Sequence, residues 1–395
     1  MSFVMSPLKD LLLKVDKWNP AKEAGDSLIK YIDLSSVDKD SKRIIDDEVQ
    51  ELFGSKAPSR ARQLVSEKDI LVATVRPNLN GVASVPGELE GATASTGYCV
   101  LRVNEELLDS KYLFYWVQTE LFVNDMISKA SGANYPAVSD KIIKDSKIPL
   151  PPLEEQKRIA AILDKADAIR QKRKQAIELA DEFLRSVFLD MFGDPVTNPK
   201  GFQIGTIRDI VSTVNYGTSG KASEIDGEFP ILRMGNITYK GGWDFSDLKY
   251  IDLDDKDQGK YLASKNDLLF NRTNSKELVG KTAVFNESKP MAIAGYLIRV
   301  RANDLGNPWY ISGYLNSSHG KQTLLNMCKS IVGMANINAQ ELQDIKILLP
   351  PVELQNKYES IVKEVNKRVS CHYESLKELQ TLFNALSQKA FSGQL

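Results

Sequence analysis

The sequence predicts an α+β chain in which two mixed units alternate with two long helices, arranged as an internal repeat. A nine-residue segment that begins at Ile148 returns at Ile347, an offset of 199 residues in a chain of 395 residues. Each copy ends a stretch of mixed composition and opens a long charged segment with helical spacing of its apolar residues. A further match, of Ser66 with Ser264, keeps an offset of 198 residues. A duplicated chain suggests one task performed at two places.

We place the mixed units at residues 1–150 and 194–350 and the helical segments at residues 151–193 and 351–395. Within the mixed units, short apolar runs bounded by Gly, Pro and Asn predict strands. The clearest of these runs are 69–75, 98–103, 268–271 and 292–300. Each unit also has one aromatic segment of helical character, at 110–130 and 309–329. The pattern is α+β, without a repeating βαβ rhythm.

No Pro or Gly interrupts the chain from Glu154 to Met191, which predicts the first long helix, and Gly193 follows as a stop signal. Its apolar residues fall at the three-and-four spacing of a coiled-coil seam: Ile159, Leu163, Ala166, Ile177, Ala180, Leu184 and Val187. Arg170 and Arg173 interrupt the middle of this seam. A second apolar row widens the stripe beyond the footprint of one partner helix: Ile162, Ile169, Ala176 and Phe183.

The second helix is expected from about Glu353 to Phe391 and has the more regular seam. The seam residues are Val362, Val365, Val369, His372, Leu376, Leu379, Phe383, Leu386 and Ala390. A helix of this length spans about 60 Å. We expect the two helices to pair, and a pseudo-two-fold repeat requires them to run antiparallel. His372 is then a packed seam residue.

Composition limits the class of protein. The formal net charge of −1 would ordinarily count against nucleic-acid binding, because neutralising phosphates requires a basic surface. This leaves either no DNA partner or local basic patches completed by another protein. Cys99, Cys328 and Cys371 have no paired spacing, which argues against a disulfide framework and a zinc site. With only two histidines, we expect neither a metal site nor histidine-based catalysis.

The motifs give no catalytic residue. The chain has no phosphate-binding GxxxxGK[ST] loop. The tetrapeptide from Asn307 to Tyr310, Asn-Pro-Trp-Tyr, resembles the Asn-Pro-Pro-Tyr of amino-group DNA methyltransferases but differs at the third position. No glycine-rich methyl-donor loop accompanies it, and Asn-Pro followed by aromatic residues is also an ordinary helix start.

The candidate sites are polar clusters on predicted loops, and each cluster, taken singly, is more often an ordinary solvated loop. Arg and Asn read guanine and adenine edges, and Ser and Thr bind phosphates. In the first unit the candidates are Lys56, Arg60, Arg62, Arg76, Asn78, Asn80, Asn134 and Tyr135. In the second unit they are Tyr216, Thr218, Ser219, Lys221, Arg233, Asn236, Arg272, Asn274, Ser275, Lys276 and Asn336. Arg76 and Arg272 carry most weight, because both units are expected to place an Arg-Asn turn after the equivalent strand.

Three stretches are similar to the specificity subunits of type I restriction-modification systems. These stretches are Pro149–Ala160, the helix end Phe188–Asp194, and Phe270–Ser275. The resemblance extends over essentially the full length. It implies that residues 1–150 and 194–350 are target-recognition domains, each reading one half of a split double-stranded DNA sequence. It also implies that two conserved helices hold these domains apart as a ruler.

The short apolar runs, broken by charge, and the scattered cysteines lead us to expect a cytoplasmic protein with no membrane association. The same resemblance implies a non-catalytic subunit with no cofactor of its own. Two methyltransferase subunits are expected to dock on it, carrying S-adenosylmethionine and flipping adenines for N6 methylation. Two restriction subunits, with ATP and Mg, would complete the enzyme. Partners that enclose the DNA would account for the near-neutral charge.

Two other classes stay open from the residues alone. A self-contained methyltransferase or nuclease would transfer methyl groups or cut DNA without partners. A purely structural coiled-coil dimeriser would carry two protein-binding domains and show no dependence on DNA.

Overall fold

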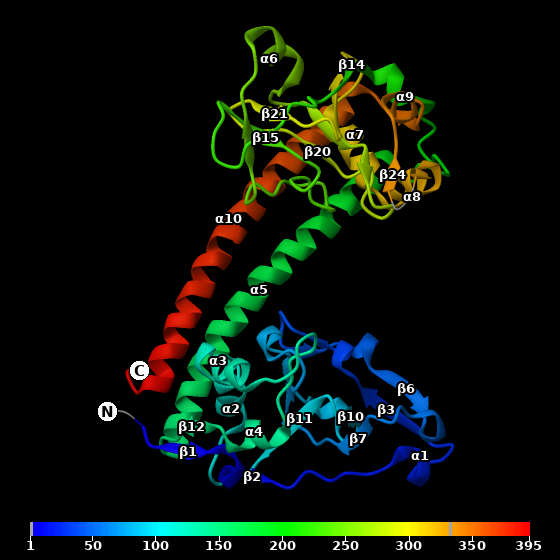
Figure 1. Cartoon of the computed structure of the whole chain (residues 1–395). Coiled ribbons are helices and arrows are strands. Elements are labelled where there is room, and N and C mark those ends of the chain that lie inside the picture. Colours follow the sequence, from blue (N-terminus) through cyan, green and yellow to red (C-terminus); the bar gives the residue numbers. More distant parts are fainter. Residues whose placement is uncertain (1–2, 332–333) are drawn as a thin grey trace. The chain divides into compact units, whose positions relative to one another are not determined.

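The computed structural model describes residues 3–331 and 334–395, and these form two compact units. Unit 1 runs to Lys174 and resumes at Glu374, and unit 2 comprises Gln175–Tyr373. The two long helices are α5 (Leu153–Phe192) and α10 (Val352–Ser392), shown in Figure 1. Both are confirmed, each one residue longer at either end than expected. Each unit contains half of both helices.

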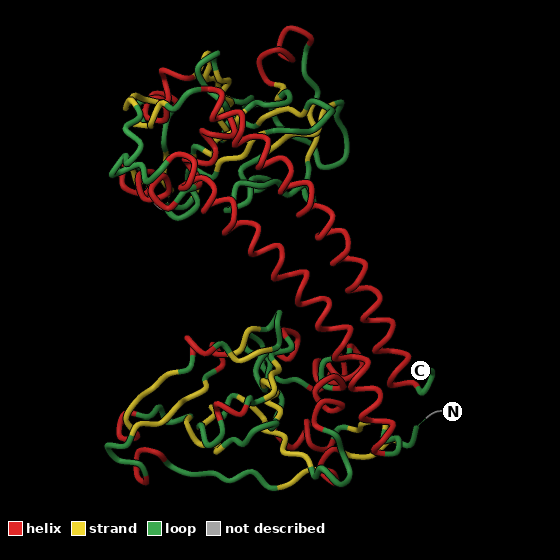
Figure 2. The backbone as a smooth tube through the Cα atoms, turned by 180° about the vertical axis from the view of Figure 1, so that it is seen from behind, coloured by secondary structure: helices red, strands yellow, loops and turns green. Residues whose placement is uncertain are grey.

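Unit 1 is built from two four-stranded sheets, and Figure 2 shows its short strands separated by long loops. The first sheet has the order β6 (Gln50–Phe53), β3 (Leu28–Ile32), β10 (Thr93–Ser95) and β7 (Ala61–Leu64). The second has the order β2 (Leu12–Leu13), β11 (Tyr98–Val103), β8 (Ile70–Ala73) and β9 (Val82–Ser84). Two small pairs are β1 (Met5–Pro7) with β12 (Lys147–Pro149) and β4 (Val37–Asp38) with β5 (Arg43–Ile44). The short helices are α1 (Pro20–Glu23), α2 (Ser110–Trp116), α3 (Glu120–Lys129) and α4 (Asp140–Asp145).

Unit 2 repeats this plan. One sheet has the order β16 (Lys249–Ile251), β15 (Phe229–Leu232), β21 (Met291–Ile293) and β17 (Leu262–Ala263). The other has the order β14 (Val211–Tyr216), β22 (Leu297–Ala302), β18 (Leu268–Asn271) and β20 (Thr282–Val284). The smaller sheets are β13 (Gln203–Thr206) with β25 (Lys346–Leu349), and β19 (Thr273–Asn274), β24 (Met334–Asn336) and β23 (Lys329–Ile331). The short helices are α6 (Asp255–Tyr261), α7 (Pro308–Asn316), α8 (Ser318–Met327) and α9 (Ala339–Gln343).

The two units share unusual details of pairing. Their first sheets are antiparallel except for one parallel pair, β3 with β10 in unit 1 and β15 with β21 in unit 2. In these pairs Ile32 faces Ala94 and Leu232 faces Ile293. The internal repeat read from the sequence is therefore a repeat of structure.

Three segments that the sequence predicts as single elements each form two elements in the structure. The segment 110–130 forms α2 and α3, because the Thr119 hydroxyl accepts from the Phe122 amide and starts a new helix. The segment 309–329 likewise divides into α7 and α8, where Ser317 caps the second helix. The run 292–300 divides into β21 and β22, because a turn at Ala294–Leu297 carries the chain from one sheet to the other. Strands 98–103 and 268–271 are confirmed as β11 and β18.

The repeated Pro-Pro segment is a structural joint, because its buried glutamine bonds the helix start to the mixed unit. Gln156 accepts from the Asp109 amide at 2.9 Å and donates to the carbonyls of Leu107 and Pro151. Gln355 makes the matching bonds in unit 2, accepting from the Asn307 amide at 2.8 Å. Both side chains are almost fully buried. A duplicated joint explains why this is the most recognisable part of the repeat.

Replacing Gln355 with alanine should destabilise unit 2 by roughly 3 kcal/mol, because the Asn307 amide and two carbonyls lose their partner. Chemical denaturation would measure this loss. Gln388→Ala is the matched control, since Gln388 lies on an exposed position of the same helix. Equal effects of the two substitutions would contradict the role of Gln355 as a joint.

A second matched joint lies between the strands of the core. Asp69 accepts two hydrogen bonds from Arg102, at 3.0 and 2.7 Å, and a third from the Ser66 amide at 2.8 Å. Asp267 accepts from Arg301 at 2.7 and 3.1 Å, again with a serine amide as the third donor. Both carboxylates are buried, so the repeated Ser-x-x-Asp motif serves the fold.

Aromatic contacts join each helix end to its unit. In unit 1, Phe391 of α10 lies 5.0 Å from Tyr112, measured between ring centroids. In unit 2, Phe192 of α5 lies 4.6 Å from Tyr310. Since α5 begins in unit 1 and ends in unit 2, and α10 does the reverse, the two helices run antiparallel.

Candidate nucleic-acid interface

In unit 1, an exposed arginine is stacked on a tyrosine. The guanidinium carbon of Arg76 lies 4.6 Å from the ring centroid of Tyr135. Arg76 follows β8 and has a φ of +52°, a left-handed conformation that is uncommon outside glycine. Its amide donates to the Pro136 carbonyl at 2.7 Å, which ties it to the loop that carries Tyr135.

Unit 2 contains the same kind of stack. The guanidinium carbon of Arg272 lies 4.8 Å from the ring centroid of Tyr216, at the end of β14. The Tyr216 hydroxyl accepts from the Ala339 amide at 3.0 Å, so the ring is held in place. Asn336 lies next to the stack on β24 and donates to the hydroxyl of Thr273 at 2.8 Å.

The register of the strands shows that the two arginines are not at equivalent positions, which corrects the expectation of an Arg-Asn turn at the same point of each unit. The Thr74 amide donates to Gly97, and the Arg272 amide donates to Tyr296, each just before the next core strand. Arg272 is therefore the counterpart of Thr74. Arg76 lies two residues further along the chain.

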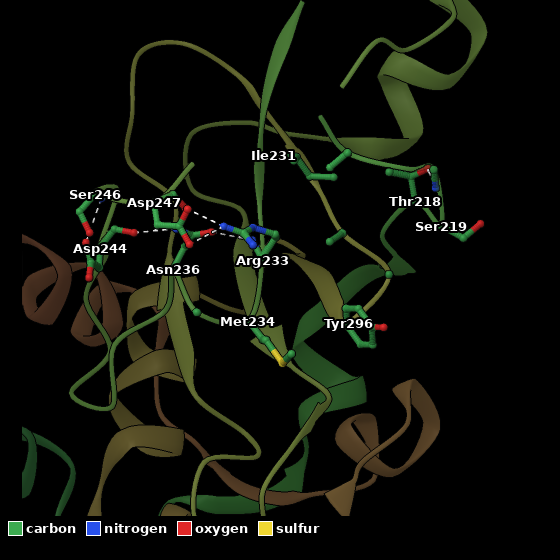
Figure 3. Close-up of a pocket in the computed structure, with 15 residues that line it drawn as sticks. Thr218, Ser219, Ile231, Arg233, Met234, Asn236, Asp244, Ser246, Asp247 and Tyr296 are labelled. Carbon is green, nitrogen blue, oxygen red and sulfur yellow. Dashed lines mark hydrogen bonds and ion pairs between the residues drawn. The ribbon is translucent and has the colours of Figure 1, made fainter. Parts of the chain in front are cut away.

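Beside the Arg272 stack, unit 2 has a cavity of about 870 Å³. Its lining includes four candidates, Thr218, Ser219, Arg233 and Asn236, together with Tyr296, which the sequence analysis missed. Figure 3 shows Arg233 directed toward Asp247 and Asn236, with Thr218 and Ser219 on another wall. The sequence offered only a tyrosine after Gly295 and before an apolar run as a signal for Tyr296, and the structure shows that its side chain is exposed.

Two of these lining residues hold the cavity wall. Arg233 donates to the carboxylate of Asp247 at 2.8 Å and to its carbonyl at 2.9 Å. The Asn236 side chain is buried, accepts from the Arg233 amide, and donates to the carbonyls of Asp244 and Asp247. Its amide group is thus used within the protein.

The remaining candidates of unit 1 divide by burial. Lys56, Arg60, Asn78 and Asn134 are exposed. Arg62 is half-buried and donates to Asn19 at 3.0 Å. The Asn80 carbonyl accepts from Lys42 at 2.5 Å, and burial lowers the pKa of Lys42 to about 8. The Asn80 side-chain amide donates to the Gln118 carbonyl at 3.3 Å, so Arg62 and Asn80 both serve local structure.

The other candidates of unit 2 lie in two segments, 218–221 and 274–276. Lys221 and Lys276 are exposed, and Thr218 caps its own turn by accepting from the Gly220 amide at 3.0 Å. Asn274 and Ser275 are half-buried at the end of β19, where the Asn274 side chain accepts from the Ser275 amide. Of the candidates, Asn274 and Asn336 lie on the small sheet formed by β19, β24 and β23, and the Arg272 carbonyl accepts from the Ile337 amide at 2.9 Å beside this sheet.

The predicted seam residues of the helices are all buried or half-buried. In α5 these are Ile159, Leu163, Ala166, Ile177, Ala180, Leu184 and Val187. In α10 they are Val362, Val365, Val369, His372, Leu376, Leu379, Phe383, Leu386 and Ala390. Arg170, which interrupts the sequence pattern, is also buried: it pairs with Asp167 and stacks on the Phe383 ring at 4.6 Å. Leu179 and Phe183 instead face outward, each about half exposed (53% and 52%).

The Asn-Pro-Trp-Tyr tetrapeptide is a helix start. Asn307 caps α7 by accepting from the Trp309 amide at 2.8 Å, and its amide group donates to Asn356 at 2.8 Å. Its side chain is buried in these contacts. Within residues 3–331 and 334–395, no cluster of three or more His, Cys, Asp or Glu side chains could hold a metal ion. No helix in the same ranges is long and apolar enough to span a membrane.

The chain is a two-unit binding protein. Its two units share the same sheets and joints, carry different loop surfaces with cationic and amide side chains, and are connected by the helix pair α5 and α10. Comparison with known families identifies it further. The model of the type I restriction modification DNA specificity domain matches residues 62–179 and 199–381, well over half of the chain. The chain belongs to this family and is a type I specificity subunit. Such subunits are non-catalytic components of type I restriction enzymes.

Individual relatives agree with this assignment. The chain is 24% identical to the EcoKI specificity subunit of Escherichia coli over 371 residues, which cover 87% of this chain and 78% of that protein. It is 22% identical to the StySPI specificity subunit of Salmonella potsdam, with the same coverage.

Two solved structures have the same fold. One comes from a study of assembly and conformational transition in the type I R-M system: it has a TM-score of 0.58, 25% identity, and coverage of 100% of this chain and 98% of that one. The type I S subunit from M. genitalium also has a TM-score of 0.58, at 16% identity, with coverage of 99% and 96%.

Proposed function

We propose that this specificity subunit reads a bipartite double-stranded DNA target, one half-site per unit, with the helix pair α5–α10 setting the distance between the half-sites. The recognition domains would be residues 1–150 and 194–350. The observation that supports this proposal is a shared frame carrying different surfaces. The same Asp-Arg and Gln joints hold both units, while residues at equivalent positions after the core strands differ.

Three equivalent positions illustrate the difference. Arg272 replaces Thr74, as the strand register requires. Arg233 follows β15 where Asp33 follows β3, so the charge is reversed. Tyr296 of the unit 2 cavity corresponds to Gly97 of unit 1. Surfaces formed by side chains of different size and hydrogen-bonding capacity would select different bases, which favours two unlike half-sites over a palindrome.

A Cβ at Gly97 would lie only 2.9 Å from the side chain of Leu34, so unit 1 could not carry a tyrosine there without repacking. Leu34 is the counterpart of Met234, which lines the unit 2 cavity. This contact gives a physical reason for the two surfaces to differ in shape as well as in charge.

The partners would be two methyltransferase subunits and two restriction subunits, with S-adenosylmethionine, ATP and Mg held by those partners. The outward apolar residues Leu179 and Phe183, one helical turn apart, offer a contact surface for a partner on the side of α5 away from its seam. Chromosomal DNA as the substrate implies a cytoplasmic location.

The test is to express the chain with its methyltransferase subunit and map N6-methyladenine in the host DNA by single-molecule sequencing. We expect two short defined sequences separated by a gap of fixed length. The methyltransferase subunit expressed alone is the control and should leave no such motif. A continuous motif, or equal methylation in the control, contradicts the proposal.

A further inference from the structure

The arginine–tyrosine stacks of the two units are alike in geometry but not in origin. The arginine comes from positions two residues apart, since Arg272 is the counterpart of Thr74. The tyrosine comes from the loop before α4 in unit 1 and from the end of β14 in unit 2. Duplication alone would leave equivalent residues, as it has at Asp69 and Asp267. The same arrangement built twice from different residues indicates selection for what the arrangement does.

The stacks leave the donor groups of the arginines available. Within residues 3–331 and 334–395, neither Arg76 nor Arg272 has a carboxylate at ion-pair distance, in contrast to Arg102 and Arg301. Stacking on a ring uses the face of the guanidinium, so the N–H groups in its plane remain free to bind acceptors. Within the same ranges the Nε of Arg272 is buried without a partner, so the terminal nitrogens of its guanidinium are the donors that a base could reach.

The backbone around each stack is also fixed. Arg76 is held in a left-handed conformation by its bond to Pro136, and the backbone of Arg272 is bonded on both sides, to Tyr296 at 3.0 Å and from Ile337 at 2.9 Å. A flexible side chain that is already ordered loses less entropy when it binds. A fixed planar fork of donors matches a pair of acceptors in one plane.

We propose that each unit reads one guanine of its half-site with this stacked arginine, Arg76 in one half and Arg272 in the other. Guanine presents O6 and N7 side by side in the major groove, and a bidentate arginine is the side chain that fits them best. A DNA phosphate offers a similar pair of oxygens and is the alternative ligand. This inference rests on the proposed function of the chain as a reader of two half-sites.

The inference is tested with the full chain in complex with its methyltransferase subunit. The variants are Arg76→Ala, Arg272→Ala and Arg272→Lys, and Arg43→Ala is the control because Arg43 is exposed but not stacked. Methylated motifs are mapped for each. We expect each alanine variant to lose one G·C position in one half-site, with discrimination there falling about 10- to 100-fold, and the other half to stay unchanged. Compared with Arg272→Ala, Arg272→Lys should recover more of the DNA affinity than of the base selectivity, because lysine lacks the planar fork of donors.

A wild-type motif with no G·C pair in one of its halves overturns the inference at once. An unchanged motif, combined with weaker binding and a smaller dependence of affinity on salt, assigns the arginines to phosphates instead and also overturns it. An unchanged motif with unchanged affinity removes them from the interface. If the wild-type complex itself yields no split motif, the proposed function fails rather than this assignment. A separate pair of variants tests the contribution of the tyrosine ring to the stack. Tyr135→Ala removes the ring and should have the same effect on the motif as Arg76→Ala, whereas Tyr135→Phe removes only the hydroxyl and should leave the motif unchanged.

Discussion

Inserting four residues into each long helix should lengthen the gap between the two halves of the methylated target by one or two base pairs. Four helical residues add about 6 Å, and B-DNA rises about 3.4 Å per base pair. Insertions after Lys174 in α5 and after Tyr373 in α10 place the added turn at the division between the compact units. Four residues are close to one turn, so the apolar seam stays on one side of each helix. Methylation mapping would show an intact sequence in each half and a longer gap.

The matched control is the same four residues inserted at Asp226, which lies in an exposed loop of unit 2. This insertion should leave the gap unchanged, because it does not lengthen either helix. An unchanged gap after the helix insertions, with methylation still present, would mean that the helices do not set the spacing. A loss of methylation in both insertion variants would indicate damage to the fold, which hydrogen exchange of the helix amides would detect.

The sequence predicts the parts of this molecule that obey local periodicity. The seams of α5 and α10 follow from three-and-four spacing, and even Arg170, which breaks the pattern, is buried through Asp167 and the ring of Phe383. The breaks inside 110–130 and 309–329 were missed because they depend on single hydroxyl caps, at Thr119 and Ser317. A cap of this kind competes with helix continuation only when tertiary packing favours the turn.

The sequence was least informative about the candidate interface. Spacing from the matched Asp residues suggested that Arg76 and Arg272 are equivalent, and the strand register showed that they are not. Asn236 was a candidate by residue type, yet its amide group is used by the carbonyls of Asp244 and Asp247. Tyr296 was missed, because one exposed tyrosine has no periodic signal. Loop residues are positioned by long-range contacts, which composition and spacing do not encode.

Replacing Asp69 with alanine should destabilise unit 1 by about 3–5 kcal/mol and abolish methylation. The substitution removes the carboxylate that accepts both bonds from Arg102 and leaves that partly buried guanidinium without its partner. The amide of Ser66 loses its acceptor as well. Hydrogen exchange should accelerate across β7, β8 and β11 and not in the sheets of unit 2. Loss of one half-site then prevents recognition of the whole target.

A neighbouring ion pair provides the control. Lys68 and Glu105 lie 3.2 Å apart, but their side chains are 57% and 67% exposed. Glu105→Ala should therefore cost at most about 1 kcal/mol and leave methylation unchanged. Asp267→Ala should reproduce the large effect in unit 2, because Asp267 holds Arg301 in the same way. If Asp69→Ala and Glu105→Ala proved equally mild, the buried pair would not be what holds the core strands together, and the repeated Ser-x-x-Asp motif would need another explanation.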